Sequence, residues 1–588
     1  MVPAQPVQGA ASRSLRRGRY ASRMRLSNLF FTTLRDDPTD AEMPSHRLLL
    51  RAGYVRQLGS GIYSLLPLGF RVNKRVEQVI REEMDRIGCQ EMEMPVVHPA
   101  DIWRASGRYD AIGPELGRFK DRNGRDMVLA MTHEEVVGLL LADIVRSYRQ
   151  LPMMVYHFQT KWRDEPRARG GLIRVREFVM KDAYSIDRDE AGLDASYWAQ
   201  HGAYVRIFER LGLDTIAVAS DVGMMGGSQA HEFMVLNPAG EDVLVLCEAC
   251  GYAANRQVAI VPKPDPAPEA ALPLEEVPTP GTTTIASLAV FLGVGADRTA
   301  KAAFFMIGDG RLVTASVRGD YAVNETKLVN AIKATGGMRP ATVEEIKAAG
   351  MEPGYGSPIG AHDTVVVVDD LVARSANLVA GANREGYHYR NVNHGRDFTA
   401  DVVADLTNAQ EGDRCPTCGE PVILRNGIEV GNIFKLGTKY TDAAGATYLG
   451  EDGVAHRIVM GSYGIGVGRN VACIVEAHHD DKGIVWPAEV APYSAHLVSI
   501  GWTREPKVNE AAERIHAFSI ASGREILWDD RDESPGVKFT DAELLGMPWI
   551  LTVSPRSLAA GGVEVTERAT GERSTRSIED VEAMLAGA

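Results

Sequence analysis

A long hairpin constrains the fold of this chain more than any other segment. Two runs of strand-forming residues, 155–160 and 177–181, flank a loop that is crowded with arginine and glycine. Because guanidinium groups present planar forks of donors that fit phosphate and carboxylate oxygens, the hairpin indicates a triphosphate site. The alternative is a solvated hairpin with surface arginines. The arginines concerned are Arg163, Arg167, Arg169, Arg174 and Arg176.

The region before the hairpin predicts a helix that runs into a strand. Apolar residues recur at helical spacing between Leu68 and Gly88, and the glycine is expected to end the helix. Residues 90–95 then alternate like a strand and end at Pro95. Since 588 residues are too many for one hydrophobic core, further domains are expected after these elements.

A proline-rich segment separates two kinds of pattern. Residues 260–284 contain seven prolines and predict a stiff, exposed linker. A compact α/β pattern follows and ends near Asp405, and a glycine-rich segment appears later at 461–468. Residues 256–410 are therefore interpreted as a domain inserted into a larger one, and the residues from 491 onward as a small βα domain.

Composition excludes some classes of protein. The net charge of −14 argues against a non-specific nucleic-acid coat protein but leaves room for a local basic surface. No apolar run reaches the roughly 18 residues of a membrane span, and no signal-peptide pattern is present, so we expect no membrane partner.

Residues 1–23 hold five arginines and no acid. An organellar transit peptide is one interpretation; we favour a disordered extension or a start codon placed too early, and a cytoplasmic protein.

Three segments together resemble the signature motifs 1, 2 and 3 of class II aminoacyl-tRNA synthetases. They are the helix and strand that end at Pro95, the Arg163-x-Glu165 hairpin, and the glycine-rich run 461–469. In detail, the chain from Met24 onward is similar to the bacterial-type prolyl-tRNA synthetases. The resemblance implies an α+β fold, in which an antiparallel class II sheet with flanking helices carries an inserted α/β editing domain and a C-terminal α/β anticodon-binding domain.

The resemblance also implies domain boundaries and a reaction. L-proline and ATP would give prolyl-adenylate, and the proline would then pass to tRNA(Pro). A homodimer is expected, because motif 1 forms the dimer interface in this class. The expected parts are an extension at 1–23, the catalytic domain at 24–255 and 411–490, the editing domain at 256–410 and the anticodon-binding domain at 491–588.

The same resemblance assigns the nucleotide site. Arg163 would bind the α-phosphate and the amino-acid carboxylate, and Arg469 the γ-phosphate, because in-line displacement at phosphorus needs fixed charge and Mg²⁺ more than covalent help. Phe178 would stack on adenine, and Glu165 would hold the adenine amino group or position the loop. Two further candidates are Arg174 for ATP and Glu429 for Mg²⁺, the latter weighed against an ordinary strand carboxylate.

A pocket for proline needs apolar walls and an acceptor near the ammonium group. By resemblance, Glu134 would pair with that ammonium, and Ser462 stands where some relatives carry cysteine. A capping box, in which Thr132 caps the helix that follows, is an alternative that can hold at the same time. The residues implied for this pocket are Thr132, Glu134, Arg163, His231, Phe233 and Ser462.

The inserted domain would remove an error that the proline pocket cannot avoid. Alanine is smaller than proline, and a difference of a few methylenes gives only about 10–200-fold discrimination. The resemblance implies a second site that hydrolyses mischarged Ala-tRNA(Pro), with Lys301 on a phosphate of the terminal adenosine. The alternatives are a solvated Lys301 and a satisfied strand histidine at 388. The implied lining is Lys301, Gly356, Pro358, Gly360, Asp369 and His388.

Two Cys-x-x-Cys pairs flank the insertion, Cys247 with Cys250 and Cys415 with Cys418. They match a tetrahedral Cys₄ zinc site, and an inserted domain must bring its entry and exit together. A structural zinc is therefore expected at its base, the alternative being reduced free thiols. Many members of the family function without these cysteines, so the metal would not be catalytic.

In the C-terminal domain, the resemblance implies that Arg531 and Lys538 read the anticodon, and the alternative is that both lie in a solvated loop.

The overall interpretation has three rivals. A threonyl- or seryl-type synthetase shares the motifs but should lack the insertion. A non-catalytic tRNA-binding regulator should lose Arg163 or Arg469, and both are present. A freestanding editing deacylase would not need the ATP motifs.

Overall fold

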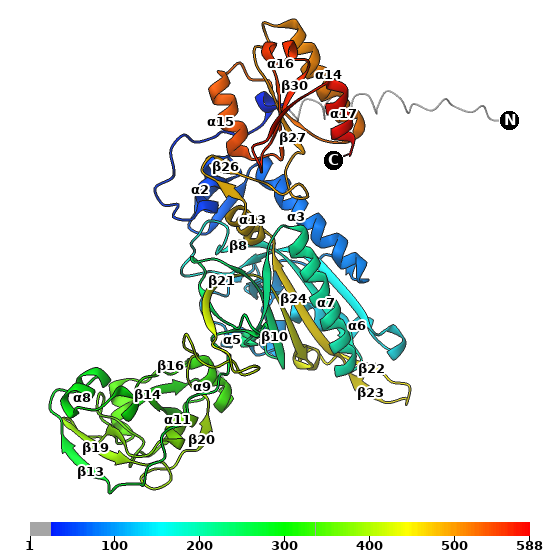
Figure 1. The fold of residues 1–588 in the computed structure, drawn as a ribbon. Coiled ribbons are helices and arrows are strands. Elements are labelled where there is room, and N and C mark those ends of the chain that lie inside the picture. The colour runs from blue at the N-terminus through cyan, green and yellow to red at the C-terminus, as the bar shows by residue number, and fades with distance from the viewer. Residues whose placement is uncertain (1–24, 335–336, 588) are drawn as a thin grey trace. The chain divides into compact units, whose positions relative to one another are not determined.

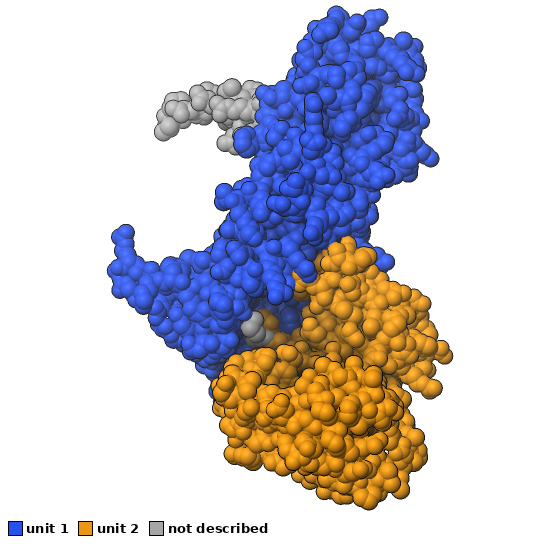
Figure 2. Space-filling model, turned by 90° about the vertical axis from the view of Figure 1, so that its left-hand side faces the viewer, with its two compact units in different colours: residues 1–215, 430–588 blue, residues 216–429 orange. Residues whose placement is uncertain are grey.

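The computed structural model describes residues 25–334 and 337–587, and its chain divides into two compact units (Figures 1 and 2). The first unit comprises residues 1–215 and 430–588, and the second comprises residues 216–429. The interpretation of residues 1–23 lies outside the described part. Among the described helices, none is both long and apolar enough to cross a membrane.

An antiparallel sheet forms the centre of the first unit, as the α+β fold requires. Strand β7 (Met153–Trp162) pairs with β8 (Glu177–Asp187), and β8 pairs with β24 (Val459–Gly466). Helix α7 (Glu190–Arg210) packs on β8 and β24 and runs beside β24 in Figure 1. Residues 432–437 of strand β21 add a further antiparallel neighbour to β24.

The predicted helix and the strand after it differ in outcome. Helix α3 (Pro67–Arg86) forms as expected, with a buried apolar face. The strand β3 covers only Gln90–Glu91, where it runs parallel to β7. It ends early because the Met94 carbonyl accepts a hydrogen bond from the Gln159 side chain, and Pro95 has no N–H to donate.

The hairpin β7–β8 depends on glycine at its tip. Gly170 and Gly171 have φ values of +66° and +62°, which L side chains rarely adopt. Any Cβ at Gly171 would also meet the His46 ring at about 3 Å. Since two successive left-handed residues close the turn, the arginines on either side of it are carried by a loop of defined shape.

The second unit contains a smaller antiparallel layer and the inserted α/β part. The five-stranded sheet of the insert has the order β16-β14-β15-β17-β20, and a three-stranded sheet has the order β13-β19-β18. This unit extends beyond residues 256–410 at both ends, because one core joins Val245 before that range, Val261 within it and Val422 after it. The insert's bounds are β13 (Glu275–Pro278), α8 (Ile285–Leu292), β14 (Ala300–Ile307), β15 (Leu312–Arg318), α9 (Glu325–Ile332), β16 (Met338–Pro340), α10 (Val343–Ala348), β17 (Thr364–Asp369), α11 (Asp370–Arg374), β18 (Leu378–Gly381), β19 (Tyr387–Val392) and β20 (Val402–Ala404). The strands before the insert are β9 (Thr215–Ser220), β10 (Gln229–Leu236), β11 (Asp242–Leu246) and β12 (Ala253–Asn255), and β21 (Ile423–Gly437) follows it.

The prediction of an exposed linker at 260–284 is wrong for two parts of that segment. Residues Glu275–Pro278 form strand β13, which pairs with β19. The side chain of Lys263 is only 4% exposed and contacts the carboxylates of Asp369, Asp370 and Asp405 at 2.5, 2.5 and 2.8 Å. A lysine can be buried here because several acids compensate its charge.

The C-terminal βα pattern is a five-stranded sheet with the order β28-β27-β29-β30-β31. In Figure 1, helices α14 and α17 lie on one side of β27 and β30, and α15 lies on the other. Its core is apolar and includes Trp528 and Leu551. The bounds are β27 (Ala495–Ser499), α14 (Pro506–Ser522), β28 (Leu527–Asp529), α15 (Pro535–Leu545), β29 (Trp549–Val553), β30 (Val563–Glu567), β31 (Arg573–Arg576) and α17 (Ile578–Gly587).

Candidate active site

A buried carboxylate, Glu134, starts helix α6 (Glu134–Ile144) in the first unit. One of its oxygens accepts a hydrogen bond from the Ser462 hydroxyl at 2.8 Å, and the other accepts one from the Thr132 hydroxyl. The structure therefore brings together three of the residues predicted for the proline pocket. The capping-box alternative is wrong, because His133 occupies the N-cap position without a side-chain cap and Thr132 donates to the carboxylate instead.

The predicted ATP residues of motif 2 lie at the loop end of the hairpin. Arg163 directly follows β7, and its guanidinium carbon is 5.4 Å from the centre of the Phe178 ring, in cation–π range. It also donates to the Met131 carbonyl at 3.3 Å. Arg469, in the first turn of α13 (Val467–Ala477), donates to the Ile173 carbonyl in the hairpin loop at 2.9 Å. Motifs 2 and 3 are thus in contact.

Glu165 holds the hairpin loop. Its carboxylate accepts from the Arg174 guanidinium at 2.8 Å and from the backbone N–H of Arg167 at 3.3 Å. Burial opposes ionisation, but these donors outweigh it and lower the pKa of Glu165. Of its two expected roles, positioning the loop is the one with contacts in the structure.

A buried ionic cluster, which was not predicted from the sequence, lies next to Glu134. The Lys161 ammonium lies 2.5 Å from Asp182, 2.6 Å from His133 Nδ1 and 3.2 Å from His157 Nε2. Burial lowers the pKa of Lys161, whereas its charge holds the pKa of Asp182 well below the usual range against the effect of burial. Burial, with Lys161 nearby, lowers the pKa of His133 to about 2, so the ring is neutral. The available signal was that His157 and Lys161 are an even number of residues apart and therefore share one face of β7.

Three predicted residues belong to the second unit. His231 and Phe233 lie in β10, where Phe233 is buried, and Glu429 lies within β21 rather than at a strand end. The roles of these three side chains stay predictions.

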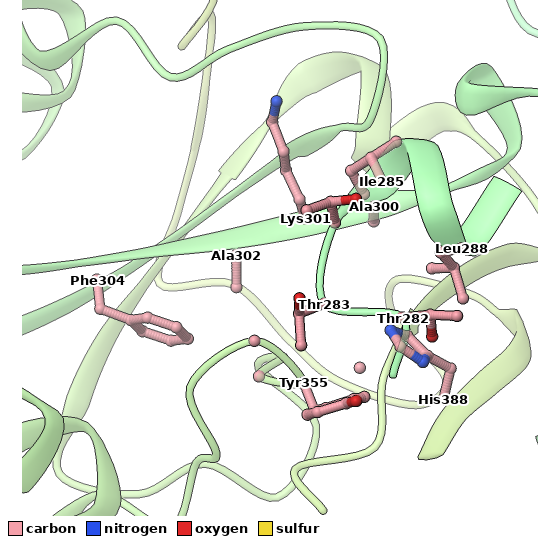
Figure 3. Close-up of a pocket in the computed structure, with 14 residues that line it drawn as sticks. Thr282, Thr283, Ile285, Leu288, Ala300, Lys301, Ala302, Phe304, Tyr355 and His388 are labelled. Carbon is pink, nitrogen blue, oxygen red and sulfur yellow. The ribbon is translucent and has the colours of Figure 1, made fainter. Parts of the chain in front are cut away.

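The insert contains a cavity of about 340 Å³. Thr282, Thr283, Tyr355 and His388 gather on one side of it, and the ammonium end of Lys301 points away from them (Figure 3). His388 Nδ1 lies 2.6 Å from the Thr279 hydroxyl oxygen. Burial lowers the pKa of His388 to about 4, which makes the ring neutral near pH 7.

The predicted editing residues divide between this cavity and its surroundings. Lys301, Gly356 and His388 line the cavity, whereas Pro358, Gly360 and Asp369 are not among its lining residues. Asp369 instead caps α11 by accepting from the Leu371 N–H at 3.0 Å and pairs with Lys263. No sequence pattern indicated this pairing, because Lys263 belongs to the segment that was predicted to be an exposed linker.

The four cysteines of the two Cys-x-x-Cys pairs converge in the second unit. The Sγ atoms of Cys247 and Cys418 are 3.5 Å apart, as are those of Cys250 and Cys415. All four sulfur atoms lie within 4.8 Å of one another. Four thiolates about 2.3 Å from a central ion would have sulfurs roughly 3.8 Å apart, so this donor set fits a tetrahedral zinc ion.

The two predicted anticodon residues are engaged inside the C-terminal sheet. Arg531 pairs with Asp529 at 2.7 Å and with Asp541 at 2.8 Å. Lys538 is 1% exposed, and its ammonium donates to the carbonyls of Ser499 and Asp529. This burial contradicts the expectation that Lys538 meets RNA bases, since the residue lies on the inner face of α15, where it closes the ends of two strands.

Comparison with known families defines the class of this fold and site. Residues 118–478 match the tRNA synthetase class II core domain (G, H, P, S and T), and residues 490–587 match an anticodon binding domain. The fold is also similar to that of a prolyl-tRNA synthetase from Cryptosporidium parvum complexed with L-proline and AMP. That likeness has a TM-score of 0.55 at 12% identity and covers 94% of this chain and 76% of the other. The core is therefore that of a class II aminoacyl-tRNA synthetase.

More similar sequences place the chain within that class. A proline–tRNA ligase of Salinispora tropica is 52% identical over 570 residues, covering 96% of each chain. One of Dehalococcoides mccartyi is 46% identical over 558 residues, covering 95% of this chain and 98% of the other. One of Thermoanaerobacter pseudethanolicus is 48% identical over 565 residues, with the same coverage. This chain belongs to the proline–tRNA ligase family.

Proposed function

We propose that this protein is a proline–tRNA ligase that converts ATP and L-proline into prolyl-adenylate and pyrophosphate, and then transfers proline to tRNA(Pro). The observation that carries the proposal is the buried Glu134 carboxylate, which Thr132 and Ser462 hold beside the motif 2 hairpin of a family member. A carboxylate in this position suits a secondary ammonium, because a hydrogen bond from a charged donor is stronger than one from an uncharged amine.

In this proposal, the arginines position and neutralise the reacting groups. Arg163 would hold the carboxylate of proline near the α-phosphate, so that one carboxylate oxygen attacks phosphorus as pyrophosphate leaves. Phe178, next to Arg163, offers its ring as the platform for adenine. Arg174 and Arg469 would take phosphate oxygens. These groups act by placement and by charge fixed in advance, which is how most phosphoryl and adenylyl transfer is accelerated.

Magnesium would accompany ATP and neutralise charge on its phosphates. Glu429 is our candidate protein ligand, because carboxylate oxygen is the donor Mg²⁺ prefers. In the described part of the chain, the clusters of three potential metal-ligating side chains do not include Glu429. A magnesium ion there would take most of its ligands from phosphate and water, as Mg²⁺ usually does.

Amino-acid-dependent ATP–pyrophosphate exchange, measured with each of the twenty amino acids, tests the function. We expect exchange with proline far above all others, with alanine as the strongest competitor. Exchange that required a different amino acid would refute the proposal. No exchange with any amino acid, together with retained tRNA binding, would favour the non-catalytic regulator.

Hydrolytic editing of Ala-tRNA(Pro) is the second proposed activity. The cavity of the insert supports it: hydroxyls and a neutral histidine surround a space that fits a small aminoacyl group, and Lys301 lies at its margin. The test is hydrolysis of pre-formed Ala-tRNA(Pro) and Pro-tRNA(Pro) by the full chain. We expect the alanyl ester to be cleaved at least tenfold faster, and equal rates would refute selective editing.

A structural zinc ion is proposed for Cys247, Cys250, Cys415 and Cys418. Protein purified without chelator should contain one zinc per chain by elemental analysis. The variant Cys250→Ser/Cys418→Ser should lose it and unfold at a lower temperature. The substitution Cys89→Ser, at a buried cysteine of the other unit, is the control and should keep the metal. Zinc-free wild-type protein would refute the site.

The homodimer is proposed from motif 1 alone, since α3 and β3 are the elements that pair across the two-fold axis in this class. Light scattering coupled to size-exclusion chromatography should give about twice the chain mass of 63.9 kDa. A monomer at micromolar concentration would contradict this proposal.

A further inference from the structure

Behind the Glu134 carboxylate lies an arginine to which no role has been given above. Arg108, on α5 (Arg108–Ala111), has a side chain that is only 6% exposed. Its guanidinium carbon lies 4.9 Å from the centre of the Trp103 ring and 5.6 Å from that of Tyr440. Because aromatic rings pack against it, the guanidinium is fixed in place before any ligand arrives.

One nitrogen of Arg108 serves two carboxylates. Its Nη1 lies 3.5 Å from Glu134 and 3.1 Å from Glu135. Both glutamates are buried, and they are adjacent at the start of α6. Ser106 completes the arrangement by donating to Glu135 at 2.9 Å.

Two adjacent buried carboxylates cannot both stay ionised without compensation. Burial raises the pKa of Glu135 even with Arg108 present. Arginine does not give up its proton in proteins, so it is a permanent counter-charge, which lysine or histidine would not be. The other titratable or charged groups that face the pair from neighbouring elements are Lys439 and Tyr440 on α12 (Lys439–Ala443), His157 and Lys161 on β7, and Asp182 and Tyr184 on β8.

We propose that Arg108 is a positioning residue for amino-acid binding, which holds Glu134 in place by compensating the charge of the adjacent pair Glu134 and Glu135. The proposal rests on the proposed function, in which Glu134 receives the proline ammonium. Without the counter-charge of Arg108, the two carboxylates would repel each other, and Glu134 would be displaced from the position in which Thr132 and Ser462 hold it.

The test compares four full-length proteins: the unaltered chain, R108Q, E135Q and R108Q/E135Q. In exchange assays, R108Q should raise KM for proline by roughly 10- to 100-fold, the usual effect of losing a charge-assisted interaction, and should change KM for ATP little. In R108Q/E135Q one carboxylate is gone, so the KM for proline should return to within about fivefold of that of E135Q.

The substitution R514Q is the matched control. Arg514 forms an exposed pair with Glu582 in the C-terminal sheet region, where its loss should leave exchange unchanged. A double variant with a KM as high as that of R108Q would overturn the proposal, because a purely structural arginine is not rescued by removing a second charge.

Thermal unfolding separates this proposal from the proposed function. A carboxyl whose folded pKa is raised stabilises the fold at low pH and loses that contribution as pH rises. The melting temperature of R108Q should therefore fall, relative to the unaltered chain, as pH rises through the raised pKa of Glu135, and the second substitution should abolish the difference. That pattern without proline-dependent exchange would refute only the proposed function. If R108Q does not fold, a folded R108Q/E135Q supports charge compensation, and an unfolded one overturns it.

Discussion

The two candidate sites differ in how they hold charge. Around Glu134, buried ionic groups occur in opposed sets, with Arg108 against the glutamates and Lys161 against Asp182. The cavity of the insert is lined by threonine hydroxyls, a tyrosine, a neutral histidine, backbone and apolar side chains such as Leu288 and Phe304, and Lys301 is the one charged side chain among its lining residues.

This contrast follows from the reactions proposed for the two sites. Activation binds a zwitterion and a triphosphate, so charge fixed in advance lowers the barrier most. Hydrolysis of an ester needs a positioned water and a few hydrogen bonds, and discrimination against proline is a matter of space. Removing a charge should therefore be severe in the first unit and mild in the second, and four experiments test that difference.

The largest effect is expected for Arg163→Ala. Exchange should fall by about 10³-fold or more, because an arginine that stabilises the reacting phosphate contributes several kcal/mol to the transition state. Binding of tRNA, measured by filter retention, should stay nearly intact. Arg457→Ala removes an exposed arginine of the same unit as the control. Unchanged exchange in Arg163→Ala would refute the assigned role.

Asp182→Asn should be the most destabilising substitution of this series. It leaves the Lys161 ammonium buried without its carboxylate, which costs about 3–5 kcal/mol. Hydrogen exchange of the β7 and β8 amides would report the loss locally. Asp369→Asn in the insert is the comparison: Lys263 keeps Asp370 and Asp405, so protection there should fall less. Equal losses would show that the two units do not differ in this respect.

Lys301→Ala tests the one charge of the cavity. Hydrolysis of Ala-tRNA(Pro) should slow roughly tenfold, as expected for losing one contact to a phosphate, and proline-dependent exchange should not change. Lys347→Ala is the control, since Lys347 is exposed in the same unit. A drop in proline-dependent exchange with normal hydrolysis of Ala-tRNA(Pro) would show that Lys301 acts in activation and not in editing.

The smallest effect is expected for the stability of the insert when the pH is lowered. The folded pKa of His388 is about 4, below the ordinary value of 6.5, so the unfolded chain takes up a proton first as pH falls. The contribution of His388 to stability is complete above pH 6.5 and is lost progressively as pH falls from 6.5 to 4. Urea unfolding of the insert at pH 7 and 5 should show this loss, and His388→Gln should reduce it. His362→Gln, at an exposed histidine, should behave like the unaltered chain.

Local patterns predicted a good part of this structure. The motif 2 hairpin, α3 and the C-terminal alternation each depend on periodicity within a short segment, and they formed as expected. The approach of Glu134 and Ser462, which are 328 residues apart in the chain, was implied by the family resemblance and could not have come from periodicity.

The elements that were missed depend on partners distant in sequence or on strand register. Asp182 reaches Lys161 because the register of β7 with β8 sets His157 opposite Asp182, and no sequence pattern fixes that register. Lys263 was assigned to a linker because the prolines around it dominate the local sequence pattern. The three carboxylates that contact its ammonium all come from residues after 368. Lys538 was read as a surface cation because only its packing shows that two carbonyls enclose it.

The two cysteine pairs are also synthesised at different times. Cys250 leaves the ribosome well before its neighbour Cys415, which is 165 residues later in the chain. At bacterial rates of about 5–20 residues per second, that interval is roughly 10–30 s. During this time the first pair of thiols exists without the second, and the insert is being made with its exit not yet joined to its entry. A nascent chain therefore passes through a stage in which half of the proposed metal site is open to oxidants or to the wrong metal, and this stage ends only when the residues just after the insert have been made.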